Sequence, residues 1–212
     1  MSKSMKCSQD SLFKISDLSN IVASNIKVKE FFESRDTIDK SLPIIKQFYG
    51  IRKLKTIYEF ASGHTFSGLY ALARNHCNNV ITSDLHFPKS TMAIQSKYSK
   101  LMARLETREE DIYQNEYHIP IYSAVLGIHP CGNLSYRVCD IAIENESPII
   151  LVPCCISKGH PSYLDTFELN KYLKHELKLA NYLSTAGYNI TIKKITEKAT
   201  PRNTIIIGTP QI

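Results

Sequence analysis

Apolar side chains recur at helical spacing through residues 11–50, which predicts a helical N-terminal extension over residues 1–50. Pro43 interrupts the second half of this pattern, so a helix that starts at Pro43 is an alternative to one that continues through it. The pattern stops at Gly50. The positions that carry it are Leu12, Ile15, Leu18, Ile21, Val22, Ile38, Leu42, Ile45 and Tyr49.

The pattern changes after Lys55, where short β-rich runs alternate with longer amphipathic stretches, as is typical of βαβ units and a parallel sheet. The runs are TIYEF, NNVITSD, LETREEDI, IPIYSAVLGIHPCG, SPIILVPCC, YNITIKKI and NTIIIG. No helical stretch separates the last two, so we expect an antiparallel hairpin joined by EKATPR. Residues 51–212 are therefore predicted to form an α/β, Rossmann-like domain. Its sheet is mostly parallel and seven-stranded, with a terminal β-hairpin and helices on both faces.

Besides LYALARNH after the first run, three stretches between the runs have the apolar spacing of helices. The first is PKSTMAIQSKYSKLMA, in which Pro88 suits the opening turn. The second is LSYRVCDIAIEN, which follows the fourth run. The third runs from about Tyr163 to Thr185, and Gly187 is placed to end it.

Composition narrows the class of protein. A chain of 212 residues with 43% hydrophobic content can bury one substantial core. Its net charge of +6 favours a polyanionic partner such as RNA. No apolar run is long enough to cross a membrane, and the N-terminus does not have the pattern of a secretory signal, so we expect an intracellular protein. The six cysteines include no C-x-x-C pair, which argues against a structural metal site.

Small and acidic residues mark the ends of the first three predicted strands. The loop EFASGHTFSG would let backbone N–H groups approach an anionic part of a ligand. Asp84 follows Gly63 by about 20 residues at the end of the second run, where a carboxylate can accept hydrogen bonds from ribose hydroxyls. Glu110 and Asp111 follow the third run. Together they indicate a ligand that contains a nucleoside; an ordinary turn, a capping Asp and a solvated acidic turn are the alternatives.

The ends of the fourth and fifth runs carry histidine and cysteine. His129 could act as a general base, because an imidazole titrates near neutral pH. Cys131, Cys154 and Cys155 could supply a thiolate that adds to a pyrimidine ring. The alternative is that these cysteines are small buried apolar residues.

Five segments together resemble the class I methyltransferases that depend on S-adenosylmethionine (SAM): YEFASGH, ITSDLH, AVLGIHPCGNLSYRVCDIAIE, ILVPCC and TPRNTIIIG. The H-x-C-G and P-C-C segments resemble the branch that contains the eukaryotic tRNA 2′-O-methyltransferase of the acceptor stem and its methyltransferase-like relatives. Two features depart from the family pattern. Ala61 stands where the E-x-G-x-G loop has its first glycine, and the N-terminal zinc-binding segment of the tRNA enzyme is missing.

The resemblance implies that Glu59, Ser62 and Gly63 cradle the methionine part of SAM, that Asp84 takes the ribose and that Asp111 lies near the adenine. His129 and Cys131 would border the methyl group and the acceptor. The full predicted cofactor-binding set is Glu59, Ala61, Ser62, Gly63, His64, Asp84, Leu85, Glu110, Asp111 and Gly127, and the predicted catalytic set is His129, Cys131 and Cys154.

The leading hypothesis is methyl transfer from SAM to an oxygen or nitrogen of an RNA nucleotide, such as one in tRNA. A protein or small-molecule acceptor is a second hypothesis. A third is a binding module without catalysis, with a protein partner, in which Ala61 marks a decayed cofactor loop. A cysteine adduct on a pyrimidine ring is a fourth.

Overall fold

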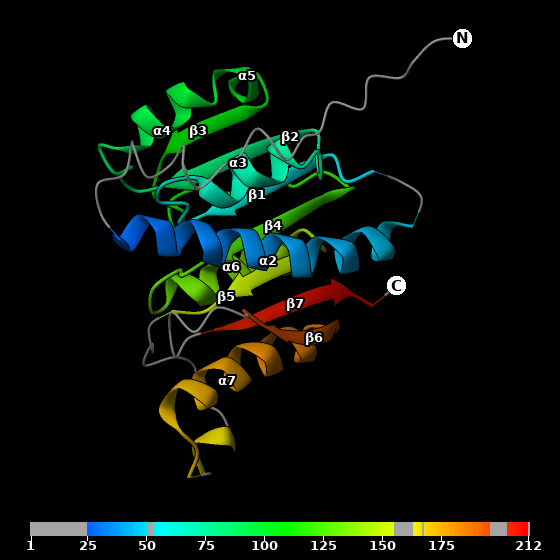
Figure 1. The fold of residues 1–212 in the computed structure, drawn as a ribbon. Coiled ribbons are helices and arrows are strands. Elements are labelled where there is room, and N and C mark those ends of the chain that lie inside the picture. Colours follow the sequence, from blue (N-terminus) through cyan, green and yellow to red (C-terminus); the bar gives the residue numbers. More distant parts are fainter. Residues whose placement is uncertain (1–24, 51–52, 155–162, 167, 196–202, 212) are drawn as a thin grey trace.

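The structure is a computed structural model that describes residues 25–50, 53–154, 163–166, 168–195 and 203–211 (Figure 1). Several sequence-based predictions lie outside these residues. They are the helix before residue 25, the EKATPR turn, and the placement of Cys155.

The described strands form one seven-stranded sheet in the order β3-β2-β1-β4-β5-β7-β6. Their bounds are β1 Thr56–Phe60, β2 Asn79–Asp84, β3 Leu105–Glu109, β4 Ser123–Ile128, β5 Ile149–Val152, β6 Tyr188–Lys194 and β7 Thr204–Pro210. The pairs among β1 to β5 are parallel, whereas β7 is antiparallel to both β5 and β6. The predicted mostly parallel sheet with a terminal hairpin is confirmed.

Helices cover both faces of the sheet, as predicted (Figure 1). Residues of α2, α3, α4 and α5 share one hydrophobic cluster with the sheet, and residues of α6 and α7 share the other. The helices are α2 Asn25–Tyr49, α3 Phe66–Ala73, α4 Thr91–Lys97, α5 Ser99–Met102, α6 Leu134–Glu144 and α7 Lys171–Thr185, with a short 3-10 helix, η2 Tyr163–Thr166. No helix in the described ranges has both the length and the apolar content needed to cross a membrane.

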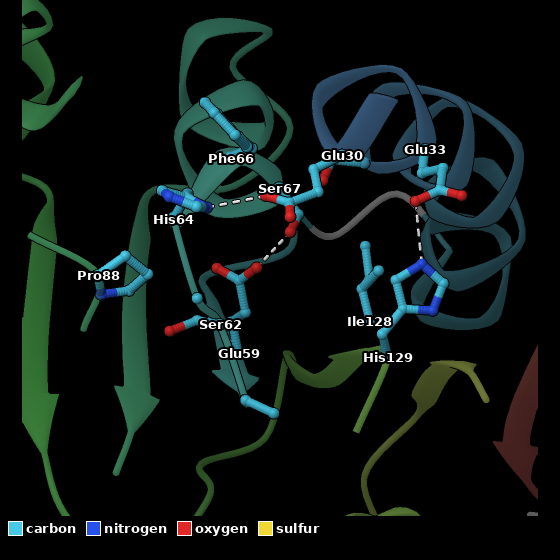
Figure 2. A pocket seen from close by; sticks show the side chains of 13 residues that line it. Glu30, Glu33, Glu59, Ser62, His64, Phe66, Ser67, Pro88, Ile128 and His129 are labelled. Atoms are coloured by element: carbon cyan, nitrogen blue, oxygen red, sulfur yellow. Dashed lines mark hydrogen bonds and ion pairs between the residues drawn. The ribbon is translucent and has the colours of Figure 1, made fainter. Parts of the chain in front are cut away.

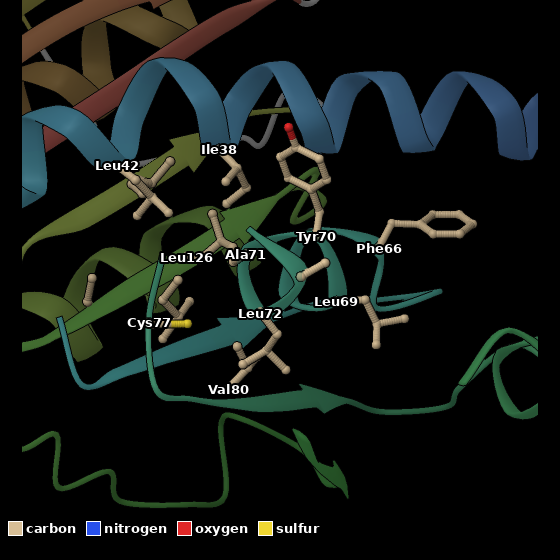
Figure 3. Close-up of a cluster of buried hydrophobic side chains, with 14 of the residues drawn as sticks. Ile38, Leu42, Phe66, Leu69, Tyr70, Ala71, Leu72, Cys77, Val80 and Leu126 are labelled. Atoms are coloured by element: carbon tan, nitrogen blue, oxygen red, sulfur yellow. The ribbon is translucent and has the colours of Figure 1, made fainter. Parts of the chain in front are cut away.

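Side chains of the central strands alternate between the two faces of the sheet, and this alternation produces the two hydrophobic clusters. In β4, Leu126 belongs to the cluster under α2 and α3, whereas its neighbour Val125 belongs to the cluster under α6. Successive strand residues point to opposite faces, so a nearly continuous apolar run fills both sides of a parallel sheet. Figure 3 shows Ile38 and Leu42 of α2 packed near Leu126, which places the N-terminal helix in the same core as the sheet.

Three helix boundaries differ from the sequence-based predictions. Pro43 lies inside α2 and does not start a helix, because its neighbours Leu42 and Ile45 are fully buried in the core and their packing offsets the hydrogen bond that proline removes. Pro88 precedes α4, and its carbonyl accepts the N–H of Thr91 in a turn. The long C-terminal helix begins only at Lys171, where the side chain of Asn170 caps it by accepting the N–H of Tyr172 at 2.9 Å.

Two further predictions need adjustment. The fourth strand starts at Ser123, later than its predicted run, and Ile119 before it is tied instead to the side chain of Asn145. The helix predicted over residues 88–103 is divided at Tyr98 into α4 and α5.

Candidate active site

The loop between β1 and α3 is built around the buried carboxylate of Glu59. Its side chain accepts hydrogen bonds from the Ser67 hydroxyl and, at 3.2 Å, from the backbone N–H of Gly68. Ser67 and Gly68 lie in the first turn of α3, so the carboxylate sits against the positive end of this helix. Ala61, Gly63 and Thr65 all have positive φ, which folds the loop tightly between strand and helix.

Burial raises the pKa of Glu59 to about 7, although its hydrogen bonds to Ser67 and Gly68 act in the opposite direction. The negative charge of Asp84 adds to the rise. Glu59 is therefore a carboxyl group whose charge depends on what binds beside it, since a cation nearby would favour the ionised form.

Glu59→Gln is expected to remove a pH dependence of stability. The pKa of Glu59 is about 7 in the folded protein, against about 4.5 for an ordinary glutamate, so its stabilising contribution is complete below about pH 4.5 and is lost as pH rises through about 7. Between about pH 5 and pH 8 the native protein should lose about 2 to 3 kcal/mol more unfolding free energy than the variant. Urea unfolding at both pH values measures this. If the native protein and the variant lost equal amounts of unfolding free energy between the two pH values, folding would leave the pKa of Glu59 unchanged.

Asp84, at the end of β2, is joined to the β1–α3 loop. One of its carboxylate oxygens accepts the backbone N–H of Gly63 at 2.9 Å, and the other accepts that of His86 at 3.2 Å. The hydroxyl of Ser62 also donates to the carbonyl of Ser83 at 3.4 Å. The loop of small residues and the acid of β2 thus lie together, as the sequence analysis expected.

The two acids that follow β3 take different positions. Glu110 accepts hydrogen bonds from Ser83 at 2.7 Å and from Tyr117 at 3.0 Å. Asp111 accepts the N–H of Tyr113 at 3.0 Å and so forms a local turn. Both nevertheless line the same cavity as Asp84.

Two cavities open at the carboxyl ends of the strands. The first has a volume of about 360 Å³, and its lining includes Asp84, Leu85, Glu110, Asp111 and Ile112. The second, of about 250 Å³, lies between the β1–α3 loop, α2 and the end of β4 (Figure 2). Ala61 lines both cavities. The predicted cofactor residues other than Gly127 are therefore distributed over two adjoining cavities.

Two glutamates of α2 reach into the second cavity, and each holds a histidine (Figure 2). Glu30 contacts Nδ1 of His64 at 2.8 Å, and Glu33 contacts Nε2 of His129 at 3.0 Å. The other ring nitrogen of His64 lies 3.0 Å from the hydroxyl of Ser90. The N-terminal helix thus forms one wall of the site.

His129 follows β4 and has a positive φ of 59°. Burial by itself would lower its pKa, but the proximity of Cys154 and the contact with the Glu33 carboxylate outweigh burial and raise the pKa to about 9. An imidazole that is protonated at neutral pH cannot accept a proton. The predicted general-base role of His129 therefore requires either release of the Glu33 contact or a pH above about 9.

The remaining predicted residues do not all meet at one point. Cys131 is exposed and lines the first cavity. Cys154 is half-buried beside His129. Gly127 lies within β4, where an added Cβ would stand 3.2 Å from Val138 and 3.3 Å from Leu151, and it lines neither of the two cavities.

Glu30 and Glu33 were not among the predicted site residues. They are three positions apart on α2, so they share one helix face, but the sequence offers no sign that this face crosses the ends of β1 and β4. An acidic pair beside the apolar Phe31 was the available signal.

No protein family model matches the sequence, and no curated protein is similar to it. Solved structures are similar in fold. Magnesium protoporphyrin IX methyltransferase from Synechocystis, with bound SAH, has a TM-score of 0.56 and 14% identity, over 88% of each chain. A candidate RNA methyltransferase from Pyrococcus horikoshii has a TM-score of 0.52 and 14% identity, over 81% of this chain and 82% of that one.

These neighbours share the arrangement of sheet and helices described above. The protein shares the α/β fold of these methyltransferases. EvdMO1 is similar as well, with a TM-score of 0.50 and 15% identity over 82% of this chain, which spans only 41% of the length of EvdMO1. The resemblance to the tRNA 2′-O-methyltransferase branch remains a prediction.

Within this methyltransferase fold, Ala61 is an unusual residue for its backbone conformation. It has a φ of 54°, in the left-handed region, where a side chain with a Cβ costs about 1 to 2 kcal/mol relative to the right-handed region. Ala61→Gly is expected to raise the unfolding free energy by about 1 kcal/mol, measured by urea denaturation. Ala71→Gly, inside α3, is the control and should lower it by at least about 1 kcal/mol. If Ala61→Gly instead lowered the unfolding free energy, the inference of backbone strain at Ala61 would be wrong.

Proposed function

We propose that the protein is a SAM-dependent methyltransferase, with the adenosine part of SAM in the cavity of Asp84 and Asp111 and the methyl acceptor in the cavity of His129. The observation that carries the proposal is the hydrogen bond of 2.9 Å between the Gly63 N–H and the Asp84 carboxylate. It brings a loop of small residues and an acid of the next strand together at the carboxyl ends of β1 and β2, beside the switch point between β1 and β4 where ligands bind in open parallel sheets.

The first cavity fits an adenosine group. Its volume of about 360 Å³ is within the range of small-molecule sites, about 300 to 1,000 Å³. Leu85 and Ile112 give it apolar surface for a base, and the carboxylate of Asp84 is half-buried beside them as an acceptor for ribose hydroxyls. Asp84 and Asp111 are therefore the first residues to change in a test of SAM binding.

The second cavity suits the reacting end of the cofactor. SAM supplies a methyl group that is already activated on a sulfonium, so the protein contributes mainly position and orientation. Glu59 can hold the cationic amino acid part, since a cation beside it would lower its raised pKa. Ser62 and the backbone of Gly63 line the same space.

We propose RNA as the acceptor. The net charge of +6 favours a polyanion, and one of the similar structures is a candidate RNA methyltransferase. The atom that receives the methyl group would be a nucleotide oxygen or nitrogen that enters the cavity lined by His129.

Two measurements, made one after the other, test the proposal. Calorimetric titration with SAM and with its demethylated product should show binding to the purified chain. Transfer of labelled methyl groups from SAM into RNA, compared with protein and small-molecule fractions, should show label in RNA. Label in protein or small molecules alone would overturn the RNA acceptor, and absence of SAM binding would overturn the enzyme and favour a binding module.

A further inference from the structure

A serine, a histidine and a glutamate from three separate elements meet beside the second cavity. Glu30 of α2 contacts Nδ1 of His64 at 2.8 Å (Figure 2), and Nε2 of the same ring lies 3.0 Å from the hydroxyl of Ser90. His64 belongs to the β1–α3 loop, and Ser90 directly precedes α4. The three side chains are therefore joined by two hydrogen bonds through one imidazole.

The carboxylate of Glu30 determines which nitrogen of His64 carries the proton. An ionised carboxylate only accepts hydrogen bonds, so its contact with Nδ1 favours a proton on that nitrogen. In the neutral imidazole Nε2 is then an acceptor, and the hydroxyl of Ser90 donates to it. His64 is thus placed to take the proton of Ser90, which would turn a weak nucleophile into a reactive one.

Neighbouring groups hold the imidazole and the hydroxyl in place. The ring of His64 is stacked on that of Phe66, with centroids 5.5 Å apart, and its side chain is only 11% exposed. The hydroxyl of Thr91 donates to the carbonyl of Gly63 at 3.3 Å, which ties the start of α4 to the loop that carries His64. The arrangement of Ser90 and His64 is therefore supported from both elements.

The ordinary role of a serine before a helix does not account for Ser90. A serine at this position usually caps the helix, because its hydroxyl accepts an N–H of the first turn. The side chain of Ser90 makes no such bond to α4, and its hydroxyl faces His64 instead. Ser90 is half-buried, so the core does not enclose it.

We propose that Ser90, His64 and Glu30 form a Ser–His–Glu triad that hydrolyses carboxylic esters of small acids, an activity separate from methyl transfer. This constellation occurs on unrelated folds and is recognised by geometry and not by the order of its residues. His64 and Glu30 line the second cavity, whose volume is about 250 Å³. Pro88 and Ile128 give that cavity apolar surface, which suits a short acyl group.

The reaction balances with the ester and water alone. The oxygen of Ser90 forms a bond to the carbonyl carbon while its proton passes to Nε2 of His64. The bond between the carbonyl carbon and the alkoxy oxygen breaks, and the leaving group takes the proton from Nε2 to become an alcohol. Water then gives a proton to Nε2 and attacks the acyl-serine, which releases the carboxylic acid and returns the proton to Ser90. Glu30 stays ionised and is a positioning residue, because it contacts the imidazole and not the ester.

The test is hydrolysis of p-nitrophenyl acetate by the full chain without SAM, together with labelling by a fluorophosphonate that reacts with activated serines. Peptide mapping should place the acetyl and phosphonyl groups on Ser90. Ser90→Ala should abolish both labels and reduce hydrolysis to background, and His64→Gln should slow hydrolysis at least about 100-fold. Absence of label on Ser90 in the native protein would overturn the triad.

Glu30→Gln tests the positioning residue. It should lower kcat about tenfold and leave KM unchanged, because it alters the orientation of the base and not the binding of the ester. Asp36→Asn is the matched control, since Asp36 lies on the same helix and contacts Lys40 at 2.9 Å. It should retain the native kcat.

Ser96→Ala is the control for loss of a serine near the start of the chain segment that follows Ser90, because the hydroxyl of Ser96 donates to the carbonyl of Ala93 within α4. A folded His64→Gln or Glu30→Gln variant with the native kcat would overturn the triad, and Glu30→Gln decides the matter if His64→Gln does not fold. No step involves SAM, so calorimetry with SAM remains an independent test of the methyltransferase.

Discussion

Alanine in place of Asp84 should weaken SAM binding about 100-fold. The carboxylate is expected to accept hydrogen bonds from the ribose hydroxyls, and hydrogen bonds to a charged group contribute about 1.5 to 3 kcal/mol each. A loss of about 3 kcal/mol corresponds to a factor of about 100 in the dissociation constant. The variant also frees the N–H of Gly63, which Asp84 holds at 2.9 Å, so the loop that cradles the cofactor loses its anchor.

Calorimetric titration of both proteins with SAM measures this effect. Glu109→Ala is the matched control, because Glu109 ends the neighbouring strand β3, is 62% exposed and lines neither cavity. It should retain the affinity of the native protein. If a folded Asp84→Ala variant bound SAM as tightly as the native protein, Asp84 would not belong to the cofactor site. The proposed function would then lose the observation on which it rests.

Valine in place of Gly68 should have the largest effect on stability. A Cβ at this position would stand 2.7 Å from Val80 and 2.8 Å from the carboxylate of Glu59. α3 must therefore move off the sheet, and overpacking of this kind costs about 3 kcal/mol. For a chain of this size the melting temperature should fall by about 6 to 12 °C.

Substitutions at Gly68 and Gly50 separate the cost of overpacking from the cost of an unfavourable backbone conformation. Gly68→Ala should give a smaller loss than Gly68→Val, since it adds only the Cβ. Gly50→Ala is the control: it has a φ of 66° and no atom within 4 Å of an added Cβ, so it should cost about 1 to 2 kcal/mol for backbone conformation alone. A Gly68→Val variant as stable as Gly50→Ala would show that α3 has room to shift.

The strands were predictable because their signal is local. Runs such as TIYEF and NTIIIG are dense in β-branched and apolar residues, and absence of a helix between the last two runs was enough to predict an antiparallel pair. Helix boundaries were less predictable. Pro43 lies inside α2 because Leu42 and Ile45 pack in a core formed by distant residues, which no local pattern contains.

The residues of the candidate site likewise divide into those that the sequence could predict and those that it could not. That Glu59, Gly63 and Asp84 lie near one another could be predicted from their places at strand ends, because carboxyl ends of parallel strands share one edge of a sheet. Glu30 and Glu33 could not, since their role depends on where α2 crosses that edge. The protonation of His129 was likewise unpredictable, because it is set by Glu33, whose contact with it spans 96 residues of sequence.

The place of β7 between β5 and β6 has a consequence for synthesis on the ribosome. β6 is translated before β7, yet its described ladder is with β7, which in turn pairs with β5. At about 5 to 20 residues per second, the nascent chain passes through a stage in which β1 to β5 can assemble while β6 has no strand to join. During that stage the edge of β5 is open to other chains, and chaperone binding should be strongest there until residues 204–210 emerge.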